Sequence, residues 1–334
     1  MKEPGLTMAD LQPNLVTVAI PAYNAAATLD ETLLSVRRQR YSNLEILVVD
    51  DGSTDTTASV AQRHADADAR VKLFRQSNAG VSAARNKALC CANGALFATV
   101  DADDVWHPDK IERQVGSMLG GSGEIVLCYT WFAYIDERGL VLSTAEPSEE
   151  GNVIARMCRG NLIGNGSSPV MLTRVLRAVG GWDLSLGGGN EDYKLFFLLA
   201  ERGNFSVVRS HLLGYRQGRE NRSSKARRML ASYDQVLAEI QPRYPEYAGE
   251  FSAGRSELIA YLFDKAVLNM KWGAAAYLLR EAWAQSRADA RAMLLTAPLI
   301  ASRIVLPLSV RAFLRARSPS ERLKACSFSQ IGLK

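Results

Sequence analysis

Leu44-Glu45-Ile46-Leu47-Val48-Val49-Asp50-Asp51-Gly52-Ser53-Thr54-Asp55 is the stretch of this chain that decides its fold. The first six residues form a short, mostly apolar run, which predicts a buried strand. Acidic residues and a Gly-Ser pair end that run, and a helix pattern from about Thr56 to His64 follows. The stretch is therefore one strand-turn-helix unit with carboxylates at the carboxyl end of its strand.

The same unit recurs on both sides of this stretch. Strand patterns lie at residues 15–20, 71–74 and 95–100, and helix patterns separate them. Repeated units at this spacing predict an α/β fold with a mainly parallel sheet flanked by helices, followed after Tyr215 by a helical region. In such sheets ligands collect at the carboxyl ends of the strands.

Three polar segments follow predicted strands, namely Pro21–Asn24, Asp50–Asp55 and Asp101–Asp104. We expect them to meet at one edge of the sheet. The three carboxylates of Asp101–Asp104 would repel one another unless a cation lay between them. A divalent cation that carries a diphosphate is the natural candidate, because Mg²⁺ and Mn²⁺ prefer hard oxygen ligands. Taken alone, this acidic segment would more readily be an ordinary surface turn.

Two helix starts carry capping signals. Thr28 with Glu31 three residues later predicts a capping box. Asn190 is placed to cap a helix that begins Glu191-Asp192, after a loop-rich stretch that includes Gly164 and Gly166. Both starts follow segments that we expect near the carboxyl edge of the sheet.

The composition divides the chain into parts of different character. Residues 1–14 are polar and predict a loose tail, residues 15–222 contain the α/β pattern, and residues 223–334 are helical and basic. Residues 1–215 carry 20 basic and 25 acidic side chains, whereas residues 216–334 carry 20 and 10. The basic excess suits phosphate groups or an anionic membrane surface, or else a solvated helical face, and we expect no nucleic-acid partner.

The cysteines and histidines exclude several kinds of site. The five cysteines are an odd number without metal-ligand spacing, which favours free thiols in a reduced cytoplasm. The three histidines are scattered and give little support to a histidine metal site or a Ser-His-Asp triad.

Apolar runs at 293–301 and 304–308 are too short and broken to span a bilayer. They predict either a helical cap on the catalytic unit or peripheral contact with the inner face of the membrane.

Five motifs together resemble the family 2 glycosyltransferases with the GT-A fold, over roughly residues 15–220. The motifs are Val18–Asn24, Val48–Asp55, Asn78–Asn86, Asp101–Asp104, and Gly181-Trp182-Asp183 followed by Glu191-Asp192. The resemblance implies transfer of a sugar from a UDP- or dTDP-sugar to a hydroxyl of a glycan or lipid-linked acceptor in cell-envelope glycan synthesis. It also implies Mn²⁺ or Mg²⁺ and a single displacement with inversion. Residues 15–110 would form the nucleotide-sugar half and residues 111–222 the acceptor half.

The resemblance also implies roles for individual residues. Asp103 would be the main metal ligand, and Asp101 would support it from the ribose side or through water. Asp51 is favoured over Asp50 to accept a hydrogen bond from the nucleobase, and Asp50 could instead support the turn. The other residues implied to contact the nucleotide sugar are Pro21, Ala22, Tyr23, Asn24, Gly80, Arg85, Ala102 and Arg216. Gln217, where many relatives carry His, leaves the diphosphate contact of Arg216 open.

Asp192 matches the catalytic base of the family, and Glu191 is the alternative. The acceptor hydroxyl must lose a proton as it attacks, so a carboxylate within hydrogen-bonding reach is required. The first turn of a helix favours the ionised form that can accept this proton. The structural alternative is that both acids are ordinary first-turn residues.

Two other functions stay open at this point. A nucleotidyltransferase can share the fold and an acidic metal site, but it would be expected to carry a glycine-rich basic loop, which Pro21–Asn24 is not. A nucleotide-sugar-binding module without turnover would not need the acids at 101, 103 and 192. The sequence also lacks a Q-x-x-R-W segment with flanking membrane helices, which argues against a processive synthase.

Overall fold

The computed structural model describes residues 15–120, 124–187, 189–217, 226–305 and 328; the predicted tail at 1–14 lies outside them. The strands are β1 (Val16–Ala22), β2 (Leu44–Asp50), β3 (Val71–Arg75), β4 (Leu96–Thr99), β5 (Val105–Trp106), β6 (Ile125–Ile135), β7 (Val141–Ala145), β8 (Val170–Leu172) and β9 (Asn204–Arg216). The helices of the sheet unit are α2 (Leu29–Arg37), α3 (Thr57–Ala67), α4 (Val81–Cys91), α5 (Lys110–Gly120), α6 (Ile154–Cys158), α7 (Thr173–Ala178) and α8 (Glu191–Ala200).

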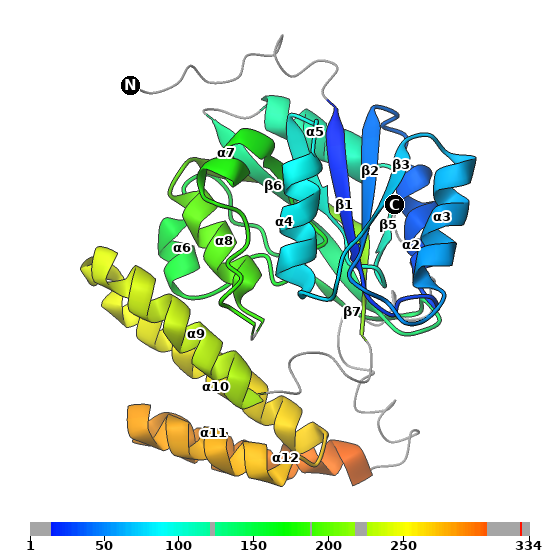
Figure 1. Ribbon diagram of the computed structural model, residues 1–334. Helices are drawn as coiled ribbons and strands as arrows, with labels where there is room; N and C mark the ends of the chain where they lie inside the picture. Colours follow the sequence, from blue (N-terminus) through cyan, green and yellow to red (C-terminus); the bar gives the residue numbers. More distant parts are fainter. Residues whose placement is uncertain (1–14, 121–123, 188, 218–225, 306–327, 329–334) are drawn as a thin grey trace.

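The strands form one sheet in the order β3-β2-β1-β4-β8-β6-β9-β5, with β7 paired to β6 (Figure 1). The strands β3, β2, β1 and β4 are all parallel, as predicted. The second half of the unit adds the antiparallel pairs, because β8 runs against both β4 and β6. The α/β prediction is therefore confirmed, and parallel pairing also joins β6 to β9 in the second half of the unit.

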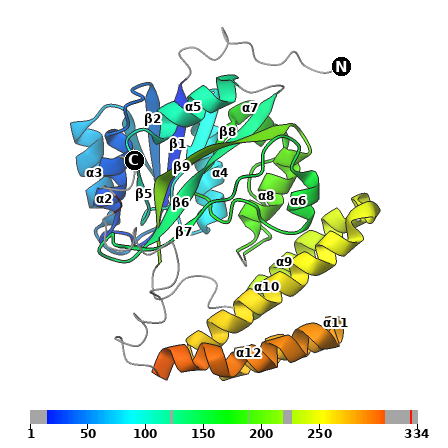
Figure 2. The same cartoon turned by 180° about the vertical axis from the view of Figure 1, so that it is seen from behind.

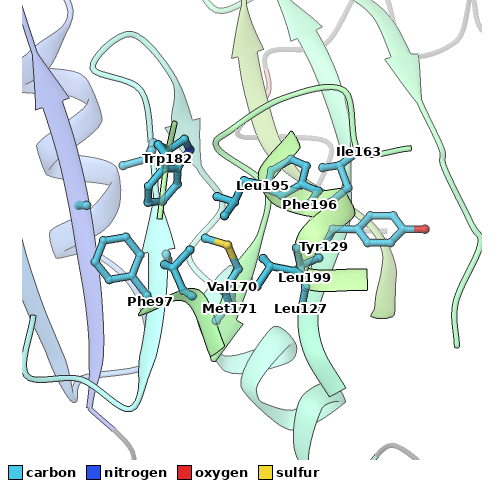
Figure 3. Packing of buried hydrophobic residues seen from close by; sticks show 14 of the residues in the cluster. Phe97, Leu127, Tyr129, Ile163, Val170, Met171, Trp182, Leu195, Phe196 and Leu199 are labelled. Carbon is cyan, nitrogen blue, oxygen red and sulfur yellow. The ribbon is translucent and has the colours of Figure 1, made fainter. Parts of the chain in front are cut away.

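Helices cover the sheet on both faces. Helix α4 packs on β1 and β2 at the front of Figure 1, and α5 packs on β6 and β9 at the front of the opposite view in Figure 2. Every residue of β1 and β2 is buried, as expected for parallel strands covered on both sides. Figure 3 shows Phe97 of β4 and Met171 of β8 in the same core as Trp182 and Phe196. This core supports α8, which carries the predicted base.

Strand β1 continues beyond the position where Pro21 was expected to stop it. Pro21 pairs with Val49 of β2, while β4 pairs with β1 only as far as Ala19. A proline lacks the N–H that a strand donates, so it fits only where a neighbouring strand needs none. The strand can therefore reach Ala22 and deliver the next residues to the edge of the sheet.

The helical region forms a second unit beneath the sheet (Figure 1), built from α9 (Ala226–Ile240), α10 (Ala248–Leu268), α11 (Trp272–Gln285) and α12 (Arg287–Val305). Two short 3-10 helices, Gln241–Arg243 and Pro245–Tyr247, separate α9 from α10. Helix α12, which contains the apolar run at 293–301, packs on α10 and α11. Within the described ranges, no helix is both long and apolar enough to cross a bilayer.

Helix α10 attaches to the sheet unit at Gly254. A Cβ atom at this position would lie 2.1 Å from the carbonyl oxygen of Arg159 and 3.0 Å from the hydroxyl of Tyr233. The guanidinium of Arg159 adds an ion pair of 2.6 Å to Glu257 on the same helix. Glycine is therefore the residue that lets α10 approach the backbone after α6.

Gly254→Ala is expected to destabilise the protein by about 1–3 kcal/mol, because the methyl group would push α10 away from the Arg159 carbonyl. Gly249→Ala is the matched control, since a Cβ atom at Gly249 of the same helix meets nothing within 4 Å. Alanine there should be neutral or slightly stabilising. Urea unfolding of both variants measures the difference, and equal midpoints would contradict the close contact at Gly254.

Candidate active site

An open cleft of about 1360 Å³ lies at the carboxyl ends of the parallel strands. Its walls come from the loops after β1, β2 and β4, from the start of α8, and from α9 and α10. It brings together nearly all of the predicted site residues: Pro21, Ala22, Tyr23, Asn24, Asp51, Gly80, Arg85, Asp101, Ala102, Asp103, Glu191, Asp192 and Arg216. Asp50 is the one predicted residue that does not line it.

Asp51 fixes the loop that leads into α4. One of its carboxylate oxygens accepts hydrogen bonds from Gln76 Nε2 at 2.8 Å and Ala79 N at 2.9 Å. The other oxygen accepts a bond of 2.8 Å from the N–H of Gly80. Gly80 adopts φ 92, a left-handed conformation that favours glycine. Asp51 therefore shapes the loop beside the exposed ring of Tyr23, where the nucleobase was predicted.

Asp50 and Asn24 stabilise the turn next to this pocket. Asp50 is buried and accepts a hydrogen bond of 3.0 Å from Ser53 N, the turn-supporting alternative for this residue. Asn24, at φ 48, accepts a bond of 2.9 Å from Thr54 N. Asn and Asp side chains commonly close turns in this way. These contacts join the end of β1 to the turn after β2.

The carboxylates of the acidic segment after β4 point in two directions, into the cleft and into the protein interior. Asp101 and Asp103 line the cleft, whereas Asp104 is fully buried and accepts hydrogen bonds from Ser167 Oγ at 2.5 Å and Arg216 N at 2.8 Å. Burial raises the pKa of Asp104 well above its usual range, and the charges of Asp103 and Asp101 raise it further. This segment is therefore a concentration of negative charge with two carboxylates exposed to the cleft.

Arg85 connects this segment to the predicted base. Its guanidinium lies 2.7 Å from Asp101 Oδ1 and 2.9 Å from Asp192 Oδ1, and the side chain is only 2% exposed. Burial alone would lower the pKa of Arg85, but the nearby charges of Asp192, Asp101 and Glu191 outweigh burial and raise it. The guanidinium of Arg85 is thus permanently charged and holds two carboxylates from distant parts of the chain.

Asp192 sits in the first turn of α8 with one oxygen held in place. Oδ1 accepts the bond from Arg85 and another of 2.8 Å from Trp182 Nε1. Oδ2 faces Gly166. A Cβ atom added to Gly166 would lie 2.9 Å from Oδ2 of Asp192 and 2.6 Å from Nη2 of Arg85. Two donors to Oδ1 therefore orient the carboxylate of Asp192. Its Oδ2 lies so close to Gly166 that a side chain at position 166 would clash with it. Glu191 is buried beside it and also lines the cleft.

Arg216 ties the end of β9 to the acidic segment. Its guanidinium donates to the carbonyl oxygens of Asp103, Asp136 and Glu137, and it pairs with Glu31 at 2.6 Å. The side chain lines the cleft beside Gln217, so its contact with a diphosphate stays a prediction. The structure adds that Arg216 holds the main-chain oxygen of Asp103 in place.

Residues 165–168 complete the site, although the sequence pointed only to Gly166 as part of a loop-rich stretch and assigned no role to any of them. The carbonyl of Gly166 accepts a hydrogen bond from Thr99 Oγ1, and Ser167 Oγ accepts a bond of 3.0 Å from Asp101 N. Asn165 Oδ1 accepts bonds from the N–H groups of Ser167 and Ser168. The signal was the cluster of glycines in this loop, which marked a close approach of backbone without naming what approaches it.

The residues present fit a divalent cation that is held partly by its substrate. Asp101 and Asp103 offer hard oxygen ligands on the cleft side of the most negative part of the site. In the described residues, no three His, Cys, Asp or Glu side chains gather closely enough to hold a metal ion by themselves. Mg²⁺ sites commonly use one or two carboxylates together with substrate phosphates.

Comparison with known proteins agrees with this arrangement. Residues 17–172 match the family described as Glycosyl transferase family 2. Over 261 residues the chain is 29% identical to WfgD of Escherichia coli, named UDP-Glc:alpha-D-GlcNAc-diphosphoundecaprenol beta-1,3-glucosyltransferase, covering 77% of this chain and 94% of that protein. Over 106 residues it is 40% identical to the putative teichuronic acid biosynthesis glycosyltransferase TuaG of Bacillus subtilis, covering 31% of this chain and 42% of that protein.

Two solved structures share the fold. The mannosyltransferase PcManGT from Pyrobaculum calidifontis, in complex with GDP-Man and Mn²⁺, has a TM-score of 0.57 at 19% identity, covering 94% of this chain and 87% of that one. TarS 1-349 of S. aureus, in complex with UDP-GlcNAc, has a TM-score of 0.54 at 17% identity, covering 81% and 91%. Residues 17–172 therefore form a family 2 glycosyltransferase domain, and the fold is the GT-A fold of these two structures.

Proposed function

We propose that this glycosyltransferase transfers a sugar from a nucleoside diphosphate sugar, a UDP- or dTDP-sugar, to a hydroxyl of a lipid-linked or glycan acceptor, with inversion. The observation that carries the proposal is the buried guanidinium of Arg85, which holds Asp101 of the donor side and Asp192 of α8 in one cleft. A donor sugar bound between them would face an oriented carboxylate. The activity named for the Escherichia coli relative supports a diphosphate-linked lipid as acceptor.

Asp192 is the proposed general base. Two hydrogen bonds fix Oδ1 and hold the carboxylate in one orientation, which leaves Oδ2 as the oxygen that would take the proton. A base must lie within hydrogen-bonding reach of the proton that it removes, and a fixed carboxylate meets this need once the acceptor binds. Proton removal by Asp192 as the hydroxyl attacks from the face opposite the leaving group gives inversion in a single displacement.

Asp103, supported by Asp101, is proposed to hold Mn²⁺ or Mg²⁺. The bound cation would neutralise the charge that develops on the departing nucleoside diphosphate. The chain itself positions this segment, since Thr28 Oγ1 donates a bond of 2.8 Å to the carbonyl of Ala102 and Arg216 holds the carbonyl of Asp103. Because such an acceptor resides in a membrane, we propose that the enzyme works in the cytoplasm at the inner face of the cell membrane.

A screen of UDP-, dTDP- and GDP-sugars with Mn²⁺ and Mg²⁺ tests the proposal. At least one donor should be cleaved or transferred, and EDTA should abolish the reaction. Asp103→Ala should weaken metal-dependent donor binding by about tenfold or more, while Glu112→Ala, an exposed acid on α5, should not. Binding of a donor without any cleavage would instead support a module without turnover. Failure of every donor to bind would refute the proposal.

A further inference from the structure

The wall of the cleft that α9 and α10 provide carries one continuous stripe of side chains. Gly254, Leu258, Tyr261 and Lys265 of α10 all line the cleft, and their spacings of four, three and four place them on one face of the helix. Leu268 continues the stripe three residues later and is 41% exposed. The stripe therefore leads out of the cleft along α10.

Exposed apolar side chains stand where the stripe ends. Met270 is 63% exposed and Trp272, at the start of α11, is 60% exposed. Figures 1 and 2 show this turn between α10 and α11 at the end of the helical unit remote from α6 and α8. Large apolar groups exposed together commonly mark a binding surface. The polar cleft thus continues into an apolar surface along a single helix.

The inner end of the stripe contains a poorly satisfied polar group. The hydroxyl of Tyr233 is buried and, apart from its contact with Tyr193, makes no hydrogen bond of normal geometry among the described residues; the whole residue is 3% exposed. Its ring stacks on Tyr193, the residue after Asp192, with centroids 5.4 Å apart. A buried hydroxyl without a well-formed hydrogen bond is unfavourable, which points to a ligand that supplies an acceptor atom beside the base.

A positive charge lies farther along the same wall. The ammonium of Lys265 is 5.3 Å from the centre of the Tyr261 ring, and no carboxylate among the described residues lies within 4.0 Å of it. Arg159 at the same wall is instead already paired with Glu257 and Glu250. Lys265 is therefore placed to pair with an anionic ligand in the cleft.

We propose that this wall is the binding site for a diphosphate-linked lipid acceptor. Tyr233 and Lys265 would contact the diphosphate, and the apolar tail would leave along Leu268 toward Trp272. From the base outward the wall presents the hydroxyl of Tyr233, then Tyr261 with Lys265, and then the exposed apolar side chains of Leu268 and Trp272, so its polar and cationic groups lie nearer the base than its apolar end. The inference rests on the proposed function and names the part of the enzyme that would select its acceptor.

Farnesyl diphosphate is a suitable probe for this wall, with farnesol and inorganic pyrophosphate as its two halves. Calorimetry would be run on the full chain in EDTA, so that a metal ion does not draw diphosphate to the acids at 101 and 103. We expect farnesyl diphosphate to bind more tightly than either half. Lys265→Gln should weaken its binding by about tenfold, and Tyr233→Phe by about fivefold.

Two further variants separate the parts of the site. Arg280→Gln removes one positive charge from α11, where the side chain is 80% exposed, and should leave binding unchanged. Trp272→Ala should weaken the binding of farnesyl diphosphate and leave the binding of pyrophosphate unchanged. Equal affinity for farnesol and farnesyl diphosphate, or equal losses in Lys265→Gln and Arg280→Gln, would overturn the inference. Donor cleavage in the screen above is scored separately, so it can succeed while this wall fails.

Discussion

Asp192→Asn is expected to reduce the rate constant for sugar transfer by about 10²–10⁴-fold, the usual contribution of a general base. Asparagine keeps an oxygen that can accept the bonds from Arg85 and Trp182, so the cleft should keep its shape. It cannot accept the proton of the acceptor hydroxyl. Steady-state kinetics should therefore show a large fall in kcat with little change in the KM for the donor.

Glu191→Gln is the control for this experiment, because it changes the neighbouring acid in the same turn of α8. It should retain most of the transfer activity. A fall in kcat for Glu191→Gln but not for Asp192→Asn would assign the proton transfer to Glu191. Equal rates for Asp192→Asn and the unmodified enzyme would remove Asp192 from the mechanism.

Arg85→Met is expected to lower the free energy of unfolding by about 3–5 kcal/mol, since removing one partner of a buried ion pair leaves its charge uncompensated. Two carboxylates, Asp101 and Asp192, would lose their shared cation at once. Urea unfolding followed by far-UV circular dichroism measures the loss.

Arg209→Met provides the matched comparison. Arg209 also pairs with a carboxylate, Glu150 at 3.1 Å, but both side chains are 50% exposed. Exposed pairs contribute at most about 1 kcal/mol, so this variant should stay close to the unmodified protein. If Arg85→Met were no less stable than Arg209→Met, the guanidinium of Arg85 would not be the buried connection described above.

The sequence predicts the strands, the cleft and most of its residues, because these depend on local patterns. Apolar runs define β1, β2 and β4, and parallel strands bring their carboxyl ends to one edge whatever the other residues do. Asp51, Asp101, Asp103 and Asp192 therefore meet as expected. The continuation of β1 past Pro21 escaped prediction, since it depends on where the neighbouring strand stops.

Hydrogen-bond and ion-pair partners that lie far apart in the sequence could not be predicted. Thr28 and Glu31 fit a capping box, but that prediction was wrong: Thr28 makes no side-chain capping bond and donates to the Ala102 carbonyl, while Glu31 pairs with Arg216. Asn190 likewise makes no side-chain cap and donates instead to the carbonyl of Met229. Local propensity identifies a polar residue at a helix start, and tertiary contacts then decide how its side chain is used.

The single guanidinium between Asp101 and Asp192 has a consequence for how this enzyme can change by mutation. Groups that share one partner are energetically coupled, so the effects of substitutions at Asp101 and at Asp192 will not be additive. A variant that loses either acid also alters the electrostatic environment of the other through Arg85. The two ends of the reaction centre therefore form one mutational unit, in which the effect of a change at one depends on the residue present at the other.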